Sequence, residues 1–371
     1  MKRIIINGAN GYVASNFINE LLLSGEYEVI ALVRADLKYS ADDKMKKALS
    51  EILDCKYKES QRLKVYNYSL LDKNFSIPEK QLEEIFDRDA DYFHFAASLK
   101  YDLKSKDLIF STNVDGVENS INVFLKFAKA RSRFFYISTA YSCGRITGPF
   151  EERFYEDEEI CRFRNYYEQS KRFAENVVKK YLETTQLNGY IIRLSQVVGN
   201  NKTGVTKTDY GIFDFTKRVY NLAYRHPNET VRVKVDPDST QNLIPIDLVI
   251  SYLFRILETE KLPVIMNFIA KNSIKNGHIA DSLSKLLPIH IIPDKSLGHI
   301  QMNAFERIIS IGMSFTSSYA DTHILFDTRN LDSIVLTDGN QPTEQTVFRM
   351  LEYFIDNLSE KKRKTVYTSV S

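Results

Sequence analysis

A tyrosine and a lysine stand four residues apart in the run Tyr167-Glu168-Gln169-Ser170-Lys171. If this run is helical, the two side chains lie on one face, because residues four apart are neighbours on a helix. A nearby ammonium group lowers the pKa of a phenol, which then exchanges a proton with a carbonyl oxygen near neutral pH. The pair therefore predicts acid–base chemistry at a carbonyl group, although this spacing alone is common by chance.

Two hydroxyl residues, Ser138 and Thr139, end an apolar run that precedes this tyrosine. A residue at the carboxyl end of a strand faces the ligand crevice of a doubly wound sheet. We expect Thr139 to hydrogen-bond the substrate oxygen that Tyr167 protonates, with Ser138 as the alternative for that role. The context of strand, hydroxyl and helix makes the tyrosine–lysine pair a candidate catalytic site.

The first strand-like run, Arg3–Asn7, leads into a GxxGxxA pattern and then into a helical pattern. Gly8 permits a tight turn, and Gly11 lets the backbone approach a pyrophosphate. The N-terminus of the following helix offers free N–H groups to the phosphates. The residues expected to bind a dinucleotide here are Gly8, Asn10, Gly11, Tyr12 and Val13.

The residue after the second strand indicates which dinucleotide is bound. An NAD site usually has an acid at this point, which holds the ribose hydroxyls. Here the strand ends at Val33 and Arg34 follows, and a guanidinium suits a 2′-phosphate. The sequence therefore favours NADP(H). The fourth strand ends in small residues, so Ala96 is expected close to the cofactor, whereas His94 is interpreted as structural.

Apolar strands alternate with amphipathic helices through the first half of the chain. Continuous apolar strands separated by helices predict an α/β fold with a doubly wound parallel (Rossmann) sheet. The expected strands are Arg3–Asn7, Glu28–Val33, Leu63–Tyr68, Asp91–Phe95, Phe134–Ser138 and Tyr190–Leu194.

The pattern becomes less regular after Val198. We expect residues 1–198 to form the dinucleotide-binding domain, with strands from about 225–250 returning to its sheet. Residues 199–358 should form mainly a smaller substrate-binding region, and 359–371, with its charged run, a solvated tail. The segment from Gly199 to Tyr224, rich in aromatic residues, is expected to line or cover the substrate site.

Composition excludes several classes of function. A net charge of +2 gives no reason to expect nucleic acid as a partner. The three cysteines form no CxxC pair, so reduced thiols in the cytoplasm are expected. The apolar runs are too short or too interrupted for a signal peptide or membrane insertion. No cluster has metal-ligand spacing, so no metal is implied.

Over roughly residues 1–250 these motifs, in this order, resemble the extended short-chain dehydrogenases. Within that group the chain is most similar to the thioester-reductase and fatty acyl-CoA reductase (male-sterility-like) branch. The motifs that carry this likeness are Leu32-Val33-Arg34-Ala35 with an inserted helix from Asp42 to Leu53, His94–Ser98, Asn113-Val114-Asp115-Gly116, Ile137–Tyr141, Tyr167–Lys171, Arg193–Gly199, Asn242–Asp247 and Phe326–Asn330.

The resemblance implies a catalytic set of Thr139, Tyr167 and Lys171, with Asn113 as a supporting residue. Lys171 would also hold the nicotinamide ribose. Two positions depart from the family pattern. Ser69 stands where an aspartate that contacts the adenine is common, and Leu194 stands where a proline is usual.

The leading hypothesis is NADPH-dependent reduction of an acyl thioester, on coenzyme A or an acyl carrier protein, to an aldehyde or alcohol. A nucleotide-sugar epimerase or dehydratase, or another carbonyl reductase of this type, is a second hypothesis. Epimerases generally retain NAD and would favour an acid where Arg34 stands. A third is a non-catalytic NADP-sensing protein, which would need none of Thr139, Tyr167 and Lys171.

Overall fold

The computed structural model describes residues 1–53, 55–312, 319, 323–335 and 341–368, without the side chains of 311, 312 and 361–368. The chain divides into two compact units. The first unit comprises Met1–Leu194, Ile250–Phe268 and Phe326–Thr337. The second comprises Ser195–Val249, Ile269–Leu325 and Asp338–Ser371.

The first unit is built on a seven-stranded sheet with the order β11-β6-β5-β4-β1-β2-β3. Every neighbouring pair in it is parallel. The order runs outward in both directions from the first strands, which confirms the doubly wound α/β fold. The strands are β1 (Lys2–Asn7), β2 (Tyr27–Val33), β3 (Leu63–Asn67), β4 (Ala90–His94), β5 (Arg133–Thr139), β6 (Gly189–Leu194) and β11 (Ile265–Phe268).

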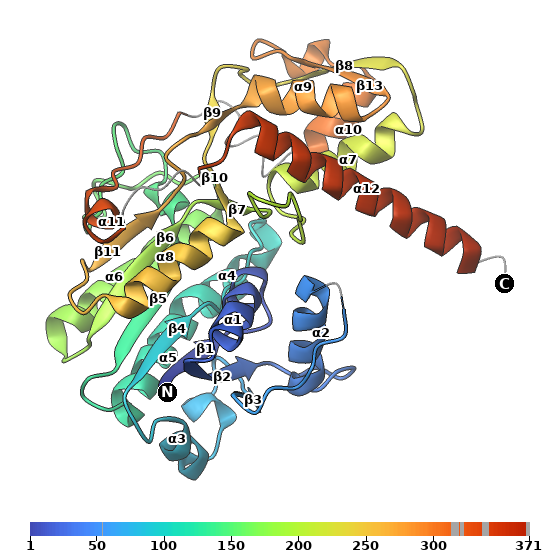
Figure 1. Cartoon of the computed structure of the whole chain (residues 1–371). Helices are drawn as coiled ribbons and strands as arrows, with labels where there is room; N and C mark the ends of the chain where they lie inside the picture. Colours follow the sequence, from blue (N-terminus) through green and yellow to red (C-terminus); the bar gives the residue numbers. More distant parts are fainter. Residues whose placement is uncertain (54, 313–318, 320–322, 336–340, 369–371) are drawn as a thin grey trace. The chain divides into compact units, whose positions relative to one another are not determined.

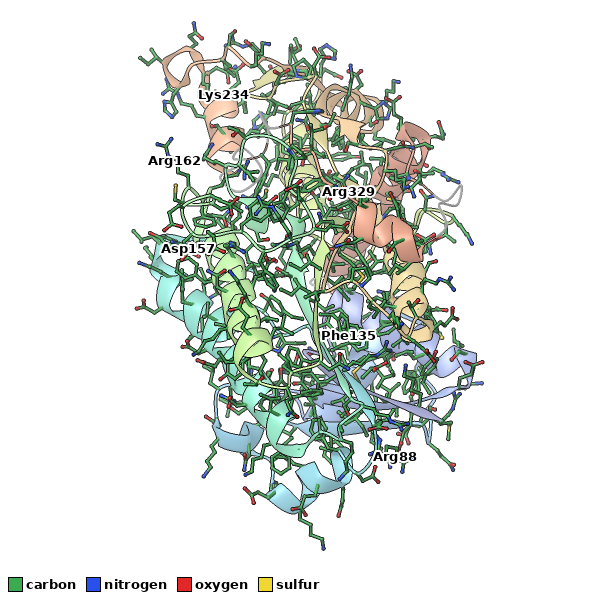
Figure 2. All side chains as sticks on the ribbon, turned by 90° about the vertical axis from the view of Figure 1, so that its left-hand side faces the viewer. Arg88, Phe135, Asp157, Arg162, Lys234 and Arg329 are labelled. Atoms are coloured by element: carbon green, nitrogen blue, oxygen red, sulfur yellow. The ribbon has the colours of Figure 1, made fainter. Side chains whose placement is uncertain are left out.

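Helices cover both faces of this sheet because both faces are apolar. On one face, Phe17 of α1 (Tyr12–Ser24) packs edge-on against Phe93 of β4 and Phe254 of α8 (Ile246–Glu258) (Figure 1). On the other, Phe124 of α5 (Gly116–Phe127) packs edge-on against Phe134, beside α6 (Tyr166–Thr184). Figure 2 shows Phe135 among the strands, where it stacks on Phe93 at 4.6 Å.

Shorter helices complete the first unit. They are α2 (Ala41–Leu53), η1 (Lys73–Ser76), α3 (Glu79–Ile85), η2 (Leu103–Ser105), α4 (Lys106–Phe110), the π-helical turn η3 (Ser111–Asp115), η4 (Ala140–Cys143) and α11 (Arg329–Ile334). The helix α2 corresponds to the charged insertion expected from Asp42 to Leu53.

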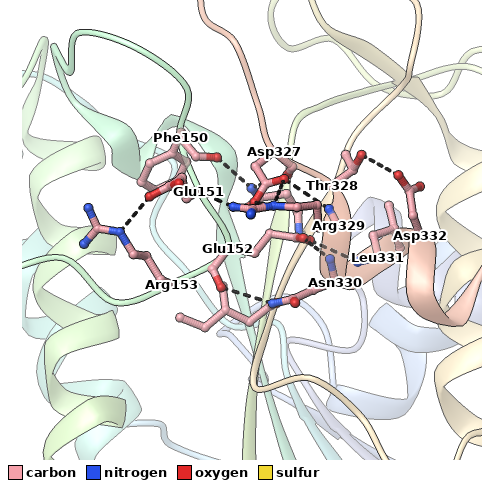
Figure 3. A network of polar contacts seen from close by, with 12 residues as sticks. Phe150, Glu151, Glu152, Arg153, Asp327, Thr328, Arg329, Asn330, Leu331 and Asp332 are labelled. Atoms are coloured by element: carbon pink, nitrogen blue, oxygen red, sulfur yellow. Dashed lines mark hydrogen bonds and ion pairs between the residues drawn. The ribbon is translucent and has the colours of Figure 1, made fainter.

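A buried carboxylate, Glu152, ties the late segment Phe326–Asn330 into the first unit (Figure 3). Its oxygens accept hydrogen bonds from the backbone N–H groups of Asn267 at 2.7 Å, Leu331 at 3.2 Å and Asn330. Burial raises the pKa of Glu152 to about 7, and these backbone bonds oppose that shift. The segment therefore secures the edge strand β11 and the start of α11.

In the described part of the second unit there are three short strand pairs and four α-helices. Its core lies between α7, α9, α12, β8 and β13, where buried apolar side chains meet. The paired strands are β7 (Gln196–Val198) with β10 (Leu243–Pro245), β9 (Thr240–Gln241) with β12 (Ile274–Lys275), and β8 (Glu229–Val233) with β13 (Ile289–Pro293). The helices are α7 (Ile212–Ala223), α9 (Asn276–Leu286), α10 (Ala304–Gly312) and α12 (Glu344–Thr368), with the 3-10 turn η5 (His299–Gln301).

The structure differs from the expected organisation at two places. The strand that returns to the large sheet is β11, whereas the strands between 225 and 250 pair within the second unit. The expected tail from 359 begins inside α12, which continues to Thr368, and residues 369–371 lie outside the described residues. Among the described residues, no helix has the length and apolar character needed to span a membrane.

Candidate active site

The dinucleotide loop has the geometry that its glycines predict. Gly8 has φ +61°, and a Cβ there would lie only 2.7 Å from the backbone nitrogen of Ala96. Gly11 precedes α1 and no side chain of the described chain caps that helix. The N-terminus of α1 brings the partial positive charge of a helix start to this loop, which therefore fits a pyrophosphate.

Asn7, which sequence reasoning missed, joins this loop to the segment after β4. Its Oδ1 accepts a hydrogen bond from the Ala96 N–H at 3.0 Å, and its Nδ2 lies 2.9 Å from Nδ1 of His94. An amide nitrogen only donates, so His94 accepts at Nδ1. Burial lowers the pKa of His94 to about 3, and the charge of Lys171 acts in the same direction. A neutral, buried His94 matches the structural role expected for it.

Tyr68 is a second residue that the sequence did not reveal. Its hydroxyl oxygen accepts a hydrogen bond from the Gly8 N–H at 3.2 Å. Burial raises the pKa of Tyr68 to about 12, so this phenol stays neutral. The neighbouring Ser69, where the family resemblance leads us to expect an aspartate, uses its backbone N–H to bond the carbonyl of Phe75 at 2.9 Å.

Arg34 follows β2 directly and is exposed. Among the described residues, its guanidinium makes no hydrogen bond or ion pair, whereas its carbonyl accepts from Lys44 at 2.9 Å. The nearest carboxylate along the chain, Asp36, pairs with Lys44 at 2.7 Å. Hydrogen bonding by Lys44 lowers the pKa of Asp36 to about 2, and the backbone N–H groups of Lys38 and Tyr39 add to it. The carboxylate of Asp36 is therefore paired with Lys44, and the guanidinium of Arg34 can contact a ligand.

The tyrosine–lysine pair lies in the first turns of α6, as its spacing predicts. Lys171 is only 3% exposed, and its Nζ donates to the carbonyl of Ile137 in β5 at 2.6 Å. The same Nζ lies 4.4 Å from the ring centre of Tyr136. Burial lowers the pKa of Lys171 to about 7, and the charge of Glu175 opposes that shift. The charge of Lys171 is therefore set by two opposing influences, burial and the carboxylate of Glu175.

Ser138 and Thr139 have different partners. The Ser138 hydroxyl donates to the buried carboxylate of Glu175 at 2.6 Å. The Thr139 hydroxyl donates to the carbonyl of Leu194 at 3.2 Å and accepts from the N–H of Tyr141. Consecutive side chains of a strand point to opposite faces. Both hydroxyls therefore donate to acceptors within the fold, on different elements.

Asn113 lies in the π-helical turn η3 and is buried. Its Oδ1 accepts from the Ser98 N–H at 2.7 Å, and its Nδ2 donates to the Ser98 carbonyl and to the Ser170 hydroxyl. The Ser170 hydroxyl in turn donates to the carbonyl of Tyr167 at 2.8 Å. Asn113 therefore connects the segment after β4 to the turn of α6 that carries the tyrosine, which suits a supporting role.

The expected site residues all belong to the first unit and lie near the carboxyl ends of its strands. Gly8, Asn10 and Gly11 follow β1, Arg34 follows β2, and Ala96 follows β4. Thr139 ends β5, and Tyr167 and Lys171 begin the helix after it. In the described part of the chain, His, Cys, Asp and Glu side chains form no group of three or more that could hold a metal ion.

The aromatic residues of the expected substrate segment fall into separate surroundings in the second unit. Phe213 is fully buried and packs against Phe354 of α12, with ring centres 5.1 Å apart. Tyr220 is also buried, and its hydroxyl contacts that of Ser359. Tyr210 is exposed, whereas Phe215 lines an apolar hollow. The segment is thus partly core and partly a lining.

Comparisons with known proteins identify the family of the chain. A sequence model of the male sterility protein family matches residues 6–253. A putative fatty acyl-CoA reductase of Drosophila melanogaster is 26% identical over 161 residues, which make up 42% of this chain and 29% of that protein. The chain thus matches less than a third of the length of this relative.

Solved structures with the same fold have low sequence identity. The terminal R domain of the myxalamid pathway has a TM-score of 0.76 at 15% identity, over 96% of this chain and 91% of that one. A thiolation-reductase di-domain of an archaeal non-ribosomal peptide synthetase gives 0.71 at 16%, over 97% and 76%. UDP-glucuronic acid 4-epimerase from Bacillus cereus, solved with NAD, gives 0.66 at 16%, over 96% and 97%.

The family model covers most of the dinucleotide unit, including every expected site residue from Gly8 to Lys171. The resemblance read from the motifs is therefore confirmed. This chain belongs to the male sterility protein family.

Proposed function

We propose that the protein reduces an acyl thioester, carried on coenzyme A or on an acyl carrier protein, with NADPH. The observation that supports the proposal is that Lys171, in the first turns of α6 with Tyr167, bonds the carbonyl of Ile137 close to Thr139 at the end of β5, in a chain of this family. The exposed thiols of Cys55 and Cys161 are in keeping with a reducing compartment, and we propose the cytoplasm.

The three side chains have distinct roles in this proposal. When bound, the cofactor supplies hydride from its nicotinamide ring. Thr139 turns its hydroxyl hydrogen from the Leu194 carbonyl toward the substrate oxygen, which becomes negative as the thioester carbonyl is reduced. Tyr167 delivers a proton to that oxygen, and Lys171 stabilises the phenolate that remains. Loss of the thiol then gives the aldehyde.

A direct assay tests this function. The purified protein is incubated with NADPH and a panel of acyl-CoA and acyl-carrier-protein thioesters, and NADPH absorbance and free thiol are followed together. Equal amounts of NADPH oxidised and thiol released identify reduction to the aldehyde, and a two-to-one ratio identifies reduction to the alcohol. Turnover of nucleotide sugars with tightly retained NAD, and none of thioesters, would instead identify an epimerase.

Cofactor preference follows from the free guanidinium of Arg34. Replacing Arg34 by Ala is expected to weaken NADPH binding by about 1–3 kcal/mol, the range for a charge-assisted hydrogen bond, and to leave NADH binding nearly unchanged. Titration calorimetry with both cofactors measures this. Lys38→Ala, which removes an exposed cation from the same loop, is the matched control. An equal loss for NADPH and NADH would show that Arg34 does not bind the 2′-phosphate.

The acyl chain is proposed to enter the apolar hollow of the second unit. This hollow is lined by apolar side chains of α7, β8, α9 and β13, with the amides of Gln241 and Asn276. Ile212 and Phe215 contribute from α7. An aliphatic chain is the kind of ligand that such a lining takes up.

Two phenylalanines of α7 provide a matched test. Phe215→Ala removes part of the lining and should raise KM for long acyl thioesters about tenfold more than for short ones, through lost apolar contact. Phe213→Ala instead leaves a cavity against Phe354 and should lower the free energy of unfolding by about 3–5 kcal/mol without discriminating chain length. If Phe215→Ala affects long and short substrates alike, the hollow does not bind the acyl chain.

A further inference from the structure

Glu175 is a fully buried carboxylate that has no part in the chemistry described so far. It lies on α6, one turn beyond Lys171. Its Oε1 accepts hydrogen bonds from the hydroxyls of Ser138 at 2.6 Å and Ser142 at 2.9 Å. Its Oε2 accepts from Nη2 of Arg193 at 2.7 Å. One side chain thus connects α6, the end of β5, the turn η4 and β6.

These bonds fix the strand end that carries the candidate catalytic hydroxyl. Ser138 precedes Thr139 and pairs in register with Arg193 on β6. Arg193 extends the connection, because its guanidinium also donates to the carbonyls of Glu151 at 2.9 Å and Arg153 at 3.1 Å. A displacement of Glu175 would therefore shift β5 relative to the helix that carries the tyrosine and the lysine.

Glu175 is also the carboxylate that three buried cations share. Arg193 forms an ion pair with it, and Nη1 of Arg172 lies 3.6 Å from its Oε2. Lys171, the third cation, is stabilised in its charged form by the same carboxylate. Buried charges of one sign need a compensating charge, since water cannot screen them.

We propose that Glu175 is a positioning residue of the active site, which anchors the strand end at Thr139 and balances the buried positive charges beside it. The inference rests on the proposed function for its catalytic consequence only. The anchoring and the charge balance are properties of the chain itself.

The charged and titratable groups around Lys171 come from four elements. Tyr167, Arg172 and Glu175 lie on α6, Tyr136 on β5, His94 on β4 and Arg193 on β6. His94 is neutral, and burial raises the pKa of Tyr136, so neither supplies a charge near pH 7. Removing the carboxylate leaves burial, which disfavours the ammonium, without the charge that opposes it.

The test is Glu175→Gln, which keeps the size of the side chain and an acceptor oxygen but removes the charge. Lys171 titration is read by NMR of lysines labelled with ¹³C at Cε, with Lys171→Met to assign the signal. The midpoint is expected to fall by about one pH unit or more. The alkaline limb of the pH profile of kcat/KM should move to lower pH by the same amount, because the ammonium is the working form.

Ser142→Ala is the matched control, because it deletes one hydrogen bond to Glu175 and leaves the charge. Its Lys171 midpoint should stay within a few tenths of a unit of that of the wild type. Arg172→Met is a second test, in which the Lys171 midpoint should shift in the opposite direction. It does not depend on whether Glu175→Gln folds. It removes a cation that competes for the carboxylate, so the midpoint should rise.

An unchanged midpoint in folded Glu175→Gln, or a midpoint that fails to rise in Arg172→Met, overturns the inference. The NMR titration needs no substrate. If the wild-type protein reduces no thioester while the midpoints move as described, the proposed function fails and the inference about Glu175 stands.

Discussion

Replacing Tyr167 by phenylalanine is expected to lower turnover about 100-fold or more, the usual contribution of a positioned general acid. The substitution removes the hydroxyl that delivers the proton and keeps the ring. Helix α6 should be unaffected, because its N-cap is the Asn165 side chain, which accepts from the N–H of Glu168 at 2.9 Å. NADPH binding, measured by calorimetry, should stay nearly intact.

The preceding residue supplies the control. Tyr166 begins the same helix, and its ring contacts Phe110 and the ammonium of Lys106. Tyr166→Phe makes the same chemical change one position away, and turnover should remain within about twofold of the wild type. Retained activity in Tyr167→Phe, with an unchanged pH dependence, would remove Tyr167 from the mechanism.

Comparison of the two variants over pH adds a sharper criterion. The pKa of Lys171 is about 7, so its charge changes within the range in which the enzyme is assayed. If Tyr167 donates the proton and Lys171 supports it, the slow reaction left in Tyr167→Phe should lose the wild-type alkaline limb. Tyr166→Phe should keep that limb.

Most strands of the first unit were predictable because they are buried on both faces, whereas the predicted strand β3 is only partly buried. The six runs expected from the sequence agree with β1 to β6 to within a residue at each end. A parallel strand covered by helices is continuously apolar, and Ile4, Ile5 and Ile6 illustrate this, all fully buried. The glycine loop was predictable for a similar reason, because its backbone geometry requires Gly8.

The division of the chain was less predictable, since it depends on contacts distant in sequence. Strand β11 pairs with β6, more than 70 residues earlier, and is secured by Glu152 and Asn330. No local pattern near Ile265 indicates that pairing. The short strands β7 and β10 are apolar as well, yet they pair with each other in the second unit.

Some buried polar residues of the site were not predicted from the sequence. In the sequence, Glu175 is one of several charged residues on an amphipathic helix. Its burial depends on its bond to Arg193, which lies on β6, and no local pattern indicates that contact. Asn7 ends an apolar strand, and a buried amide at that point is a signal that sequence reasoning could have used. Phe213 and Phe215 are two residues apart, and only tertiary packing separates a core residue from a lining residue.

Replacing Gly8 by alanine is the second change expected to have a large effect. Gly8 has φ +61°, a conformation that costs a residue with a Cβ about 1–2 kcal/mol. The added methyl would also lie 2.7 Å from the nitrogen and 2.8 Å from the Cα of Ala96, which are backbone atoms. Overpacking of this kind costs about 1–3 kcal/mol more, so we expect the free energy of unfolding to fall by about 2–5 kcal/mol.

Moving the backbone of Gly8 away from that of Ala96 should also weaken the binding of the dinucleotide. The Asn7 side chain holds Ala96 at 3.0 Å, and Tyr68 holds the Gly8 N–H at 3.2 Å. If the loop at Gly8 and the segment at Ala96 move apart, these hydrogen bonds break and the cofactor site becomes wider. NADPH affinity in Gly8→Ala is therefore expected to fall about tenfold or more, beyond any loss that unfolding accounts for.

A Gly148→Ala variant separates the cost of positive φ from the cost of the clash with Ala96. It also has positive φ, +93°, but a Cβ there would meet nothing within 4 Å. Gly148→Ala should therefore lower stability by only the backbone cost of about 1–2 kcal/mol and leave NADPH affinity unchanged. Urea unfolding and calorimetry on both variants provide the comparison. If Gly8→Ala loses no more stability than Gly148→Ala and binds NADPH normally, the close approach of Gly8 to Ala96 does not shape the cofactor site.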